Sequence, residues 1–253
     1  MPRNTFAALA LLSLIPMAQA ADAPHSADAA SPYSLTANVT LASQYRYRGL
    51  MQTDNKPAIQ GGFDLTHASG FYLGNWNSSI SWLNDSNSDV SAPVEMDFYG
   101  GYKGNLTDNV PVDLGVLQYY YPGDYPSGYT SPDTTELYAG IGYGPVMFKY
   151  SLALTNLFGF ADSKYSQYFD LSGNFDTGVW GLVVNAHVGR QIVRNVSNGS
   201  YTDWKLGVTK DFGQGLSVSL AYLDTNADRA VYTNTRGRDM GRATGLLSLT
   251  KTF

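Results

Sequence analysis

The residues that most often perform catalysis or bind metals are scarce in this chain, which has three histidines and no cysteine. Neither His25, His67 nor His187 has a nearby partner at the spacing that a metal site requires. His187 could meet a serine and an asparagine across a fold, as in a hydrolase, but residues this common lie near any histidine by chance. We therefore predict no metal, no cofactor and no enzymatic activity, with a lipid-active hydrolase as an alternative.

A glycine-rich run, Gly140-Ile141-Gly142-Tyr143-Gly144, is only superficially similar to a nucleotide-binding loop. The run alternates as a strand does, and no helix follows it to hold a phosphate at its N-terminus. Glycines in a strand also ease the curvature of a barrel, and we prefer this interpretation. Nucleic acid is not an expected partner either, because the net charge is −5 and the basic residues do not cluster.

Short segments of alternating apolar and polar residues dominate the chain. In the first segment, Leu35 and Leu41 fall on one face while Thr36 and Thr40 fall on the other. Successive side chains of a strand point to opposite faces, so residues 33–49 are predicted to form one long strand. The pattern predicts about twelve strands, at 33–49, 59–66, 72–82, 94–102, 112–116, 136–143, 148–155, 165–172, 182–189, 203–209, 216–222 and 247–253. A single-chain bacterial barrel requires an even number of strands.

The linkers between these segments alternate in length. The short linkers are 68–70, 144–145, 176–178 and 213–215, and 104–109 is somewhat longer. The long polar ones are 50–56, 84–93, 122–133, 156–163, 192–200 and 224–240. Outer-membrane barrels have short periplasmic turns and long external loops. A soluble sandwich also alternates apolar and polar residues along its strands, but it has no reason to alternate the lengths of its linkers.

The N-terminus has the features of a secretory signal, because Arg3 precedes a short apolar run and Ala18-Gln19-Ala20 forms a cleavage site. We predict a cleaved signal peptide at 1–20, a short linker at 21–32 and a transmembrane β-barrel at 33–253. No later stretch reaches the roughly eighteen apolar residues of a spanning helix, so residence in a membrane requires strands. The predicted fold class is all-β, a closed antiparallel barrel exported through the periplasm to the bacterial outer membrane.

Aromatic residues near the ends of the predicted strands are expected to form interfacial girdles. Tyr45 and Tyr47 lie near the end of the first strand, Tyr72 and Trp82 bracket the third, and Tyr119-Tyr120-Tyr121 ends the fifth. A ring at the interface can be half buried while its polar tip stays wet. The lipid-facing phase predicted for the third strand comprises Tyr72, Trp76, Ile80 and Trp82.

Three residues near strand ends have predicted roles at the periplasmic side. Lys210 and Lys251 share the apolar phase, but each ammonium group can extend to the lipid headgroups on the periplasmic side. A lysine side chain facing lipid at the bilayer midplane would instead destabilise the barrel by about 2–4 kcal/mol. Phe253 ends an alternating strand and is expected to act as the signal read by the barrel assembly machinery. Lys251 occupies a position of that signal that is more often apolar.

One part of the chain also shows a family resemblance. The runs that carry it are Ser43-Gln44-Tyr45-Arg46-Tyr47-Arg48-Gly49, Gln52-Thr53-Asp54, Lys56-Pro57-Ala58-Ile59-Gln60-Gly61-Gly62-Phe63-Asp64, Ser69-Gly70-Phe71-Tyr72 with Trp76, and Tyr121-Pro122-Gly123. The sequence resembles the TorF family of proposed porins over most of the mature chain, although Leu50-Met51 replaces the Ile-Ser associated with that place. This resemblance implies an outer-membrane barrel and brings no catalytic residues.

The polar faces of the predicted strands supply seven candidate pore-lining residues, Arg46, Arg48, Glu95, Asp97, Glu136, Asp170 and Arg242. Arg46 and Arg48 lie on the first strand, and Arg242 begins the last strand, which pairs with the first when the barrel closes. We expect these three guanidinium groups on one wall near the outer mouth, opposite the carboxylates. Such walls orient solutes in channels, but the same charges could also pair and plug a narrow barrel.

The function predicted from these features is a porin-like outer-membrane channel for passive diffusion of small hydrophilic solutes or ions. A structural or adhesive barrel with a closed lumen is the second possibility, and the lipid-active hydrolase is the third. The expected partners are outer-membrane lipids, the barrel assembly machinery and small polar solutes. Because the polar face carries both positive and negative residues, the sequence does not predict the charge of the solute.

Overall fold

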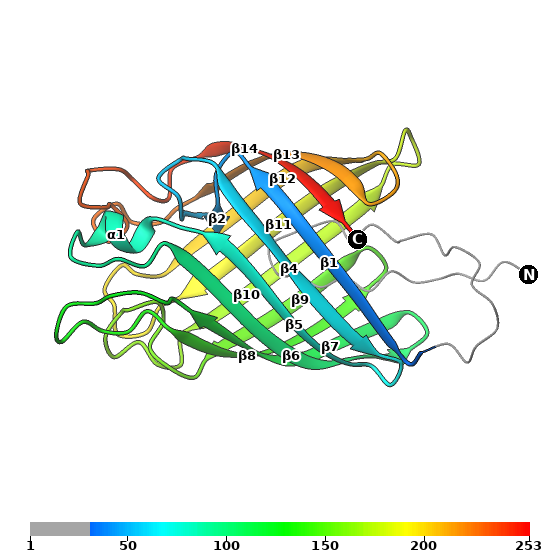
Figure 1. Cartoon of the computed structure of the whole chain (residues 1–253), viewed down its shortest axis with the longest axis horizontal. Coiled ribbons are helices and arrows are strands. Elements are labelled where there is room, and N and C mark those ends of the chain that lie inside the picture. The colour runs from blue at the N-terminus through cyan, green and yellow to red at the C-terminus, as the bar shows by residue number, and fades with distance from the viewer. Residues whose placement is uncertain (1–30) are drawn as a thin grey trace, which may run out of the picture.

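Within residues 31–253, which the computed structural model describes, twelve antiparallel strands close into one barrel (Figure 1). The strands of the barrel are β1 (Tyr33–Ala42), β4 (Ala58–His67), β5 (Phe71–Ser79), β6 (Val94–Thr107), β7 (Val110–Tyr120), β8 (Thr134–Tyr143), β9 (Val146–Ala153), β10 (Gln167–Asp176), β11 (Leu182–Ile192), β12 (Tyr201–Asp211), β13 (Leu216–Thr225) and β14 (Thr244–Thr252). Each strand pairs with its neighbours in sequence order, and β1 closes the barrel on β14, with Leu41 opposite Leu249. The predicted fold class is confirmed.

Three short elements lie outside the barrel wall. β2 (Arg46–Tyr47) and β3 (Leu50–Met51) pair as a two-stranded ribbon, and α1 (Trp82–Ser86) follows β5. Among the described residues, no helix is both long and apolar enough to cross a membrane. The predicted signal peptide 1–20 and most of the predicted linker 21–32 lie outside the described residues.

The two ends of the barrel differ in their connections, as the linker lengths predict. At one end, turns of two to five residues join β4 to β5, β6 to β7, β8 to β9, β10 to β11 and β12 to β13. At Gly144, between β8 and β9, the turn uses a φ of 55°, which a glycine adopts at little cost. The long loops and α1 gather at the opposite end, while β1 begins and the chain ends at the short-turn end (Figure 1).

Apolar side chains cover the outside of the barrel and polar ones fill its interior. Leu206 on β12 is 61% exposed, whereas Glu136 on the polar face of β8 is only 2% exposed. The outer surface also carries Leu35, Ile141 and Leu249 in exposed positions. Burying polar groups while exposing apolar ones is the reverse of a soluble sandwich, and it fits a wall surrounded by lipid.

Aromatic rings form a band on the outer surface near the short-turn end. Its exposed members are Tyr33, Phe71, Tyr102, Tyr143, Trp180, Phe212 and Phe253. Lys210 and Lys251 lie at this end too, where their ammonium groups donate to the turn carbonyls of Trp180 and Gln214. The ammonium group of each lysine is therefore hydrogen-bonded beside a turn and does not lie in the middle of the apolar surface.

The first strand is shorter than predicted, because the wall leaves the alternating pattern after Ala42. Residues 43–57, which we call the inner ribbon, contain β2 and β3 and fold into the barrel. Gly49 turns the ribbon with a φ of +77°, and a Cβ there would lie 2.8 Å from Asp203 Cβ and also clash with Thr225. The tip of the ribbon thus touches the wall formed by β12 and β13, where only glycine fits.

The third predicted strand has the opposite phase from the one expected. Leu73 is 64% exposed on the outer face, whereas Trp76 is 4% exposed and contacts Tyr45 of the inner ribbon edge-on. Tyr72 also points inward, and its hydroxyl donates to Asp113 at 2.6 Å. Large amphipathic rings can fill a lumen as well as an interface, so their presence alone does not define the lipid face.

The remaining residues predicted for that strand and its girdle also differ from expectation. Ile80 follows the end of β5 and Trp82 begins α1, so neither belongs to the membrane wall. Of the tyrosines at the end of β7, Tyr120 is exposed on the outside, whereas Tyr119 and Tyr121 are buried inside. The predicted girdle at the loop end is therefore wrong for most of the named residues.

Candidate functional site

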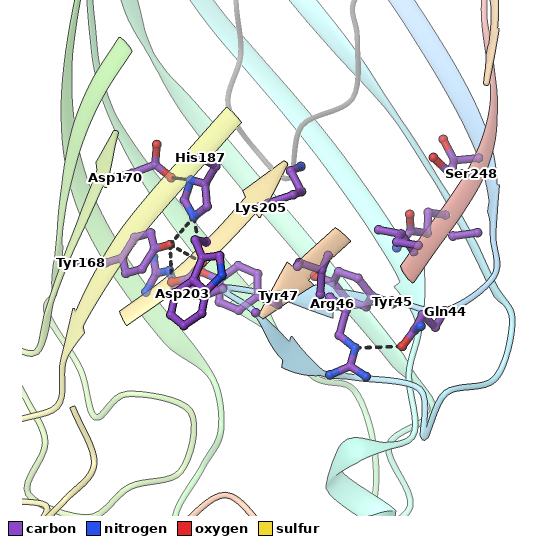
Figure 2. Close-up of a pocket in the computed structure, with 18 of the residues that line it drawn as sticks. Gln44, Tyr45, Arg46, Tyr47, Tyr168, Asp170, His187, Asp203, Lys205 and Ser248 are labelled. Atoms are coloured by element: carbon purple, nitrogen blue, oxygen red, sulfur yellow. Dashed lines mark hydrogen bonds and ion pairs between the residues drawn. The ribbon is translucent and has the colours of Figure 1, made fainter. Parts of the chain in front are cut away.

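The interior of the barrel contains a cavity of about 170 Å³ beside the inner ribbon (Figure 2). Side chains from the ribbon and from most of the strands line it. Its charged lining residues are Arg46, Arg48, Glu136, Lys149, Asp170, His187, Asp203 and Lys205, and its neutral ones include Thr40, Gln60, Ser151, Ser248 and Thr250. A cavity of this size holds several water molecules, since each takes about 30 Å³.

Arg48 joins the inner ribbon to the barrel wall across the lumen. Its Nη1 and Nη2 atoms donate to the two carboxylate oxygens of Glu136 at 2.9 and 2.7 Å, and Nη1 also donates to Gln191 at 2.8 Å. The guanidinium lies over the ring of Tyr168, 4.1 Å from its centroid. Both charged side chains are almost fully buried. A bidentate pair of this kind fixes geometry as well as charge, so it holds the ribbon in place.

Arg46 anchors the inner ribbon to the loop between β13 and β14. Its guanidinium donates to Gln44 at 2.8 Å, to the Met240 carbonyl at 2.8 Å, to the Arg242 carbonyl at 3.3 Å and to Asn55 at 2.7 Å. The Arg242 side chain itself is exposed, and its residue precedes β14. The expected wall of three lumen guanidinium groups is therefore absent from residues 31–253. Arg46 binds loop carbonyls, Arg48 pairs with Glu136, and the Arg242 side chain is exposed.

Glu95 and Asp97 lie on the inner face of β6, where the sequence pattern places them. Glu95 accepts hydrogen bonds from the hydroxyls of Tyr45 at 2.7 Å and Tyr121 at 2.9 Å. Burial, reinforced by the Glu95 carboxylate, raises the pKa of both loop phenols above the ordinary value, so each stays protonated and can donate. Asp97 is buried too, and its Oδ1 atom has no hydrogen-bond partner among the described residues.

Asp170 belongs to a second group of polar residues, centred on His187. His187 Nδ1 lies 3.1 Å from Asp170, and Nε2 lies 2.8 Å from Asp203. The Tyr168 hydroxyl donates to Asp203 at 3.0 Å (Figure 2). Because a carboxylate contacts each ring nitrogen, His187 has no nitrogen left to activate a serine, as the hydrolase alternative would need.

The sequence pattern places several of these residues correctly on polar faces without naming them as pore-lining candidates. Lys149, Tyr168, His187, Asp203 and Lys205 all occupy the polar phase of predicted strands, and all line the cavity. These residues lie on neighbouring strands, and the register between the strands determines which of them stand opposite each other. His187 on β11 is directly opposite Lys205 on β12, and Lys149 on β9 is opposite Asp170 on β10. A strand prediction without register could name the faces but not these pairs.

Phe253 lies at the short-turn end beside the start of the barrel. Its backbone N–H donates to the Ala37 carbonyl at 2.8 Å, and its ring is exposed on the outer surface. The Lys251 ammonium lies 5.3 Å from the centre of that ring. The last residue is thus held against β1 while its side chain stays accessible.

These features define a class of protein, a twelve-stranded closed barrel with an apolar outer surface and a polar interior into which one loop folds. The chain belongs to the family described as bacterial protein of unknown function (Gcw_chp), whose model matches residues 26–253. The match does not carry the name TorF, so that resemblance stays a prediction. No curated protein matches the chain by sequence.

Solved structures with a similar fold are outer-membrane porins and channels. The KdgM porin in complex with disordered oligogalacturonate has a TM-score of 0.55 at 6% identity, over 86% of this chain and 98% of that one. The NanC porin has a TM-score of 0.52 at 9% identity, over 87% and 99% of the two chains. The COG4313 outer membrane channel from Pseudomonas putida F1 has a TM-score of 0.50 at 12% identity, over 92% and 100%. At these identities the likeness establishes the shared fold.

Proposed function

We propose that the protein is an outer-membrane channel for passive passage of small hydrophilic solutes. The observation that carries the proposal is the closed barrel with an apolar outer face and a charged internal cavity of about 170 Å³. A lumen lined by polar and charged groups lets hydrated solutes cross a wall that lipid surrounds. The similar folds of KdgM, NanC and the COG4313 channel support the same assignment.

The proposal includes a cellular location and an orientation. Residues 1–20 would be removed after export, and the barrel would insert from the periplasm with its short turns on the periplasmic side. The loops and the inner ribbon would then face outward, and outer-membrane lipids would contact the apolar surface. Phe253 would serve the assembly machinery from the exposed C-terminal position described above. No catalytic step and no cofactor form part of this proposal.

The inner ribbon would form the constriction of the channel. It crosses the lumen from β1 to the wall at Asp203, and the Arg48–Glu136 pair holds it there. A charged pair in a narrow, poorly hydrated passage acts strongly on ions, because the local screening is low. Selectivity would therefore depend on this one loop and the few strand residues that face it.

A barrel with a closed lumen and a structural or adhesive role is the second candidate, and one observation favours it. The loop end is filled by a buried apolar cluster that includes Tyr45, Trp76, Leu83, Val90 and Tyr119. Such packing resembles a small protein core and could seal the barrel. Passage of solute through the proposed channel would then have to follow the polar side of the lumen, along the cavity.

Planar-bilayer recording of the purified, refolded protein distinguishes the two candidates. Folding is verified first by the change in gel mobility on boiling, which closed barrels show because they resist detergent. The channel proposal predicts discrete current steps in KCl from the heat-modifiable form. Insertion of folded barrels without any steps, against a porin control in the same bilayers, would contradict the channel and favour the closed barrel.

A further inference from the structure

Three exposed basic residues, Lys164, Arg190 and Arg194, form a basic patch on the outside of the barrel at the loop end. Lys164 lies in the loop before β10, and Arg194 lies in the loop before β12. Arg190 shares the outer face of β11 with the exposed Val188. Lys164 Nζ lies 4.9 Å and Arg194 Cζ lies 5.9 Å from the centre of the Tyr165 ring, which is 43% exposed. Two cations of the patch therefore share one accessible aromatic ring.

Carboxylates do not neutralise the basic patch. Within residues 31–253, none of its three cations forms an ion pair, and Arg190 donates to the hydroxyl of Thr202 at 3.1 Å. Asp162 is the one carboxylate in the two loops that supply Lys164 and Arg194. The next carboxylate on the outer face, Asp224, lies one strand further along the wall, on β13. The patch therefore keeps a net positive charge.

Hydrogen bonds between the two loops hold the patch in one arrangement. The backbone N–H of Arg194 donates to the buried hydroxyl of Ser166 at 3.0 Å, and the side chain of Asn195 donates to the Asp162 carbonyl at 2.8 Å. Tyr165 has a φ of +68°, in the left-handed region that bulky residues rarely adopt. Such a conformation persists only where the surrounding structure holds it, so the position of this ring is built into the loop.

The apolar wall begins directly beside the basic patch. Arg190 stands opposite Phe169 on β10, and the next outward-facing residues along these strands and β12 include Leu171, Val188 and Trp204, all exposed. A lipid against this wall places its acyl chains on the apolar side chains and its headgroup level with the cations. Basic and aromatic residues at the edge of an apolar surface are typical of contact with lipid headgroups.

We infer that the basic patch binds the phosphate-bearing headgroup of an anionic lipid in the leaflet around the loop end. Guanidinium groups donate paired hydrogen bonds to phosphate oxygens, and the lysine adds a third positive charge. The adjoining apolar wall favours a lipid over a soluble phosphate, because the acyl chains bind there as well. The inference rests on the proposed function in one respect, since the proposed orientation makes this the outer leaflet. Three cations suit a headgroup with two phosphates better than one with a single phosphate.

The test titrates three lipid probes into the folded barrel in detergent and counts bound lipids by native mass spectrometry. The probes are diphosphoryl lipid A, monophosphoryl lipid A and phosphatidylcholine, whose headgroups differ in net charge. Arg190→Gln/Arg194→Gln removes two charges of the patch, and Arg190→Lys/Arg194→Lys keeps them. Arg229→Gln/Arg242→Gln is the matched control, because it removes two exposed arginines from the loop between β13 and β14 at the same end.

The expected result is saturable binding of diphosphoryl lipid A, with the monophosphoryl form weaker and phosphatidylcholine at least about tenfold weaker. Arg190→Gln/Arg194→Gln should weaken binding of diphosphoryl lipid A about tenfold, while the lysine variant and the control change it little. Equal binding of all three probes to the unaltered protein would overturn the inference. Equal losses in the patch variant and the control would overturn it too, because the attraction would then belong to the whole loop end.

Lipid binding and bilayer current separate this inference from the channel proposal. Preferential binding of diphosphoryl lipid A together with absent KCl current would support the patch and contradict the channel. KCl current without any lipid preference would support the channel and contradict the patch. The comparison of probes on the unaltered protein needs no variant, so a folding defect in a variant does not remove the test.

The orientation of the patch is tested separately with Ser197→Cys, which places a single thiol on the exposed loop beside Arg194 in a chain without cysteine. A maleimide that does not cross membranes should label this residue on whole cells. Labelling would support the outer leaflet as the location of the bound lipid. Lack of labelling, while the protein is present in the membrane fraction, would overturn that location.

Discussion

The two halves of the lumen are built in different ways. At the loop end, the inner ribbon, α1 and the long loops enter or cover the barrel and bury a tyrosine-rich cluster. At the short-turn end, the connections have two to five residues and are too short to fold inward. The interior there is lined by strand side chains such as Tyr72, Asp113 and Tyr138, and its tyrosines extend the same buried cluster with residues of the wall alone.

This difference shows that the wall and the constriction have separate determinants. The wall depends on alternation and strand pairing, which repeat along the whole chain. The constriction depends on one loop held by a small number of buried contacts, chiefly those of Arg46, Arg48 and Gly49. Loops carried on a rigid scaffold commonly determine function in this way. Changes in the ribbon should therefore alter permeation while the barrel persists.

Removal of the inner ribbon should have the largest effect. Replacing residues 44–56 by a short turn rich in Gly and Asn joins β1 directly to β4, which already pair at Ala42 and Ala58. We expect a several-fold rise in single-channel conductance, because Arg48 and the ribbon tyrosines leave the lumen. The matched control shortens the loop 194–199, which lies outside the ribbon. Unchanged conductance in the ribbon variant alone would show that the constriction lies elsewhere.

Breaking the Arg48–Glu136 pair should have the next largest effect. Glu136→Gln leaves a buried guanidinium without its carboxylate, a change that typically costs about 3–5 kcal/mol. The double variant Arg48→Gln/Glu136→Gln should recover much of this loss, because both charges are then gone. Urea unfolding in lipid vesicles, followed by tryptophan fluorescence, measures the free energies. Strictly additive losses would mean that the two side chains are not coupled.

A charge on the outer wall should act on stability and not on permeation. Leu206→Arg places a guanidinium on the lipid-facing side of β12, where the cost is about 2–4 kcal/mol near the midplane. The same unfolding assay measures it, and any channel that still inserts should keep the original conductance. A large change in conductance with little loss of stability would mean that this face of β12 lines the lumen.

Substitution of Arg242 should have the smallest effect. Its side chain is exposed and only its carbonyl takes part in the Arg46 contacts, so Arg242→Gln should leave the reversal potential in a salt gradient nearly unchanged. Arg48→Gln, tested in the same gradient, should shift it. Equal shifts in the two variants would restore the interpretation that both guanidinium groups line the pore.

Most of the wall could be predicted from the sequence, because a lipid-facing barrel imposes a period of two on every strand. The prediction failed for β5, where Tyr72 and Trp76 look apolar but fill the lumen. Their rings can pack on either face of the wall, and it is Phe71 and Leu73 that are exposed on the outer, lipid-facing side. Residue type alone does not tell which face these rings occupy, because their inward orientation depends on contacts with Asp113 and Tyr45.

The inner ribbon could not be predicted from periodicity, because the alternation continues through Arg46 and Arg48 after β1 has ended. Its position depends on tertiary contacts with Glu136 and Asp203, which lie far away in the sequence. Gly49 was the local signal, since a glycine directly after the alternating arginines marks a turn.

Polymer exclusion from each side of the bilayer tests most directly whether one loop constricts an otherwise open barrel. Neutral polyethylene glycols of graded size are added to one compartment at a time while conductance is measured. Polymer on the short-turn side should enter the inner half and lower the current at sizes that have no effect from the loop side. The variant without residues 44–56 should lose this asymmetry. A symmetric response of the unaltered protein, equal to that of the variant, would contradict a ribbon-formed constriction.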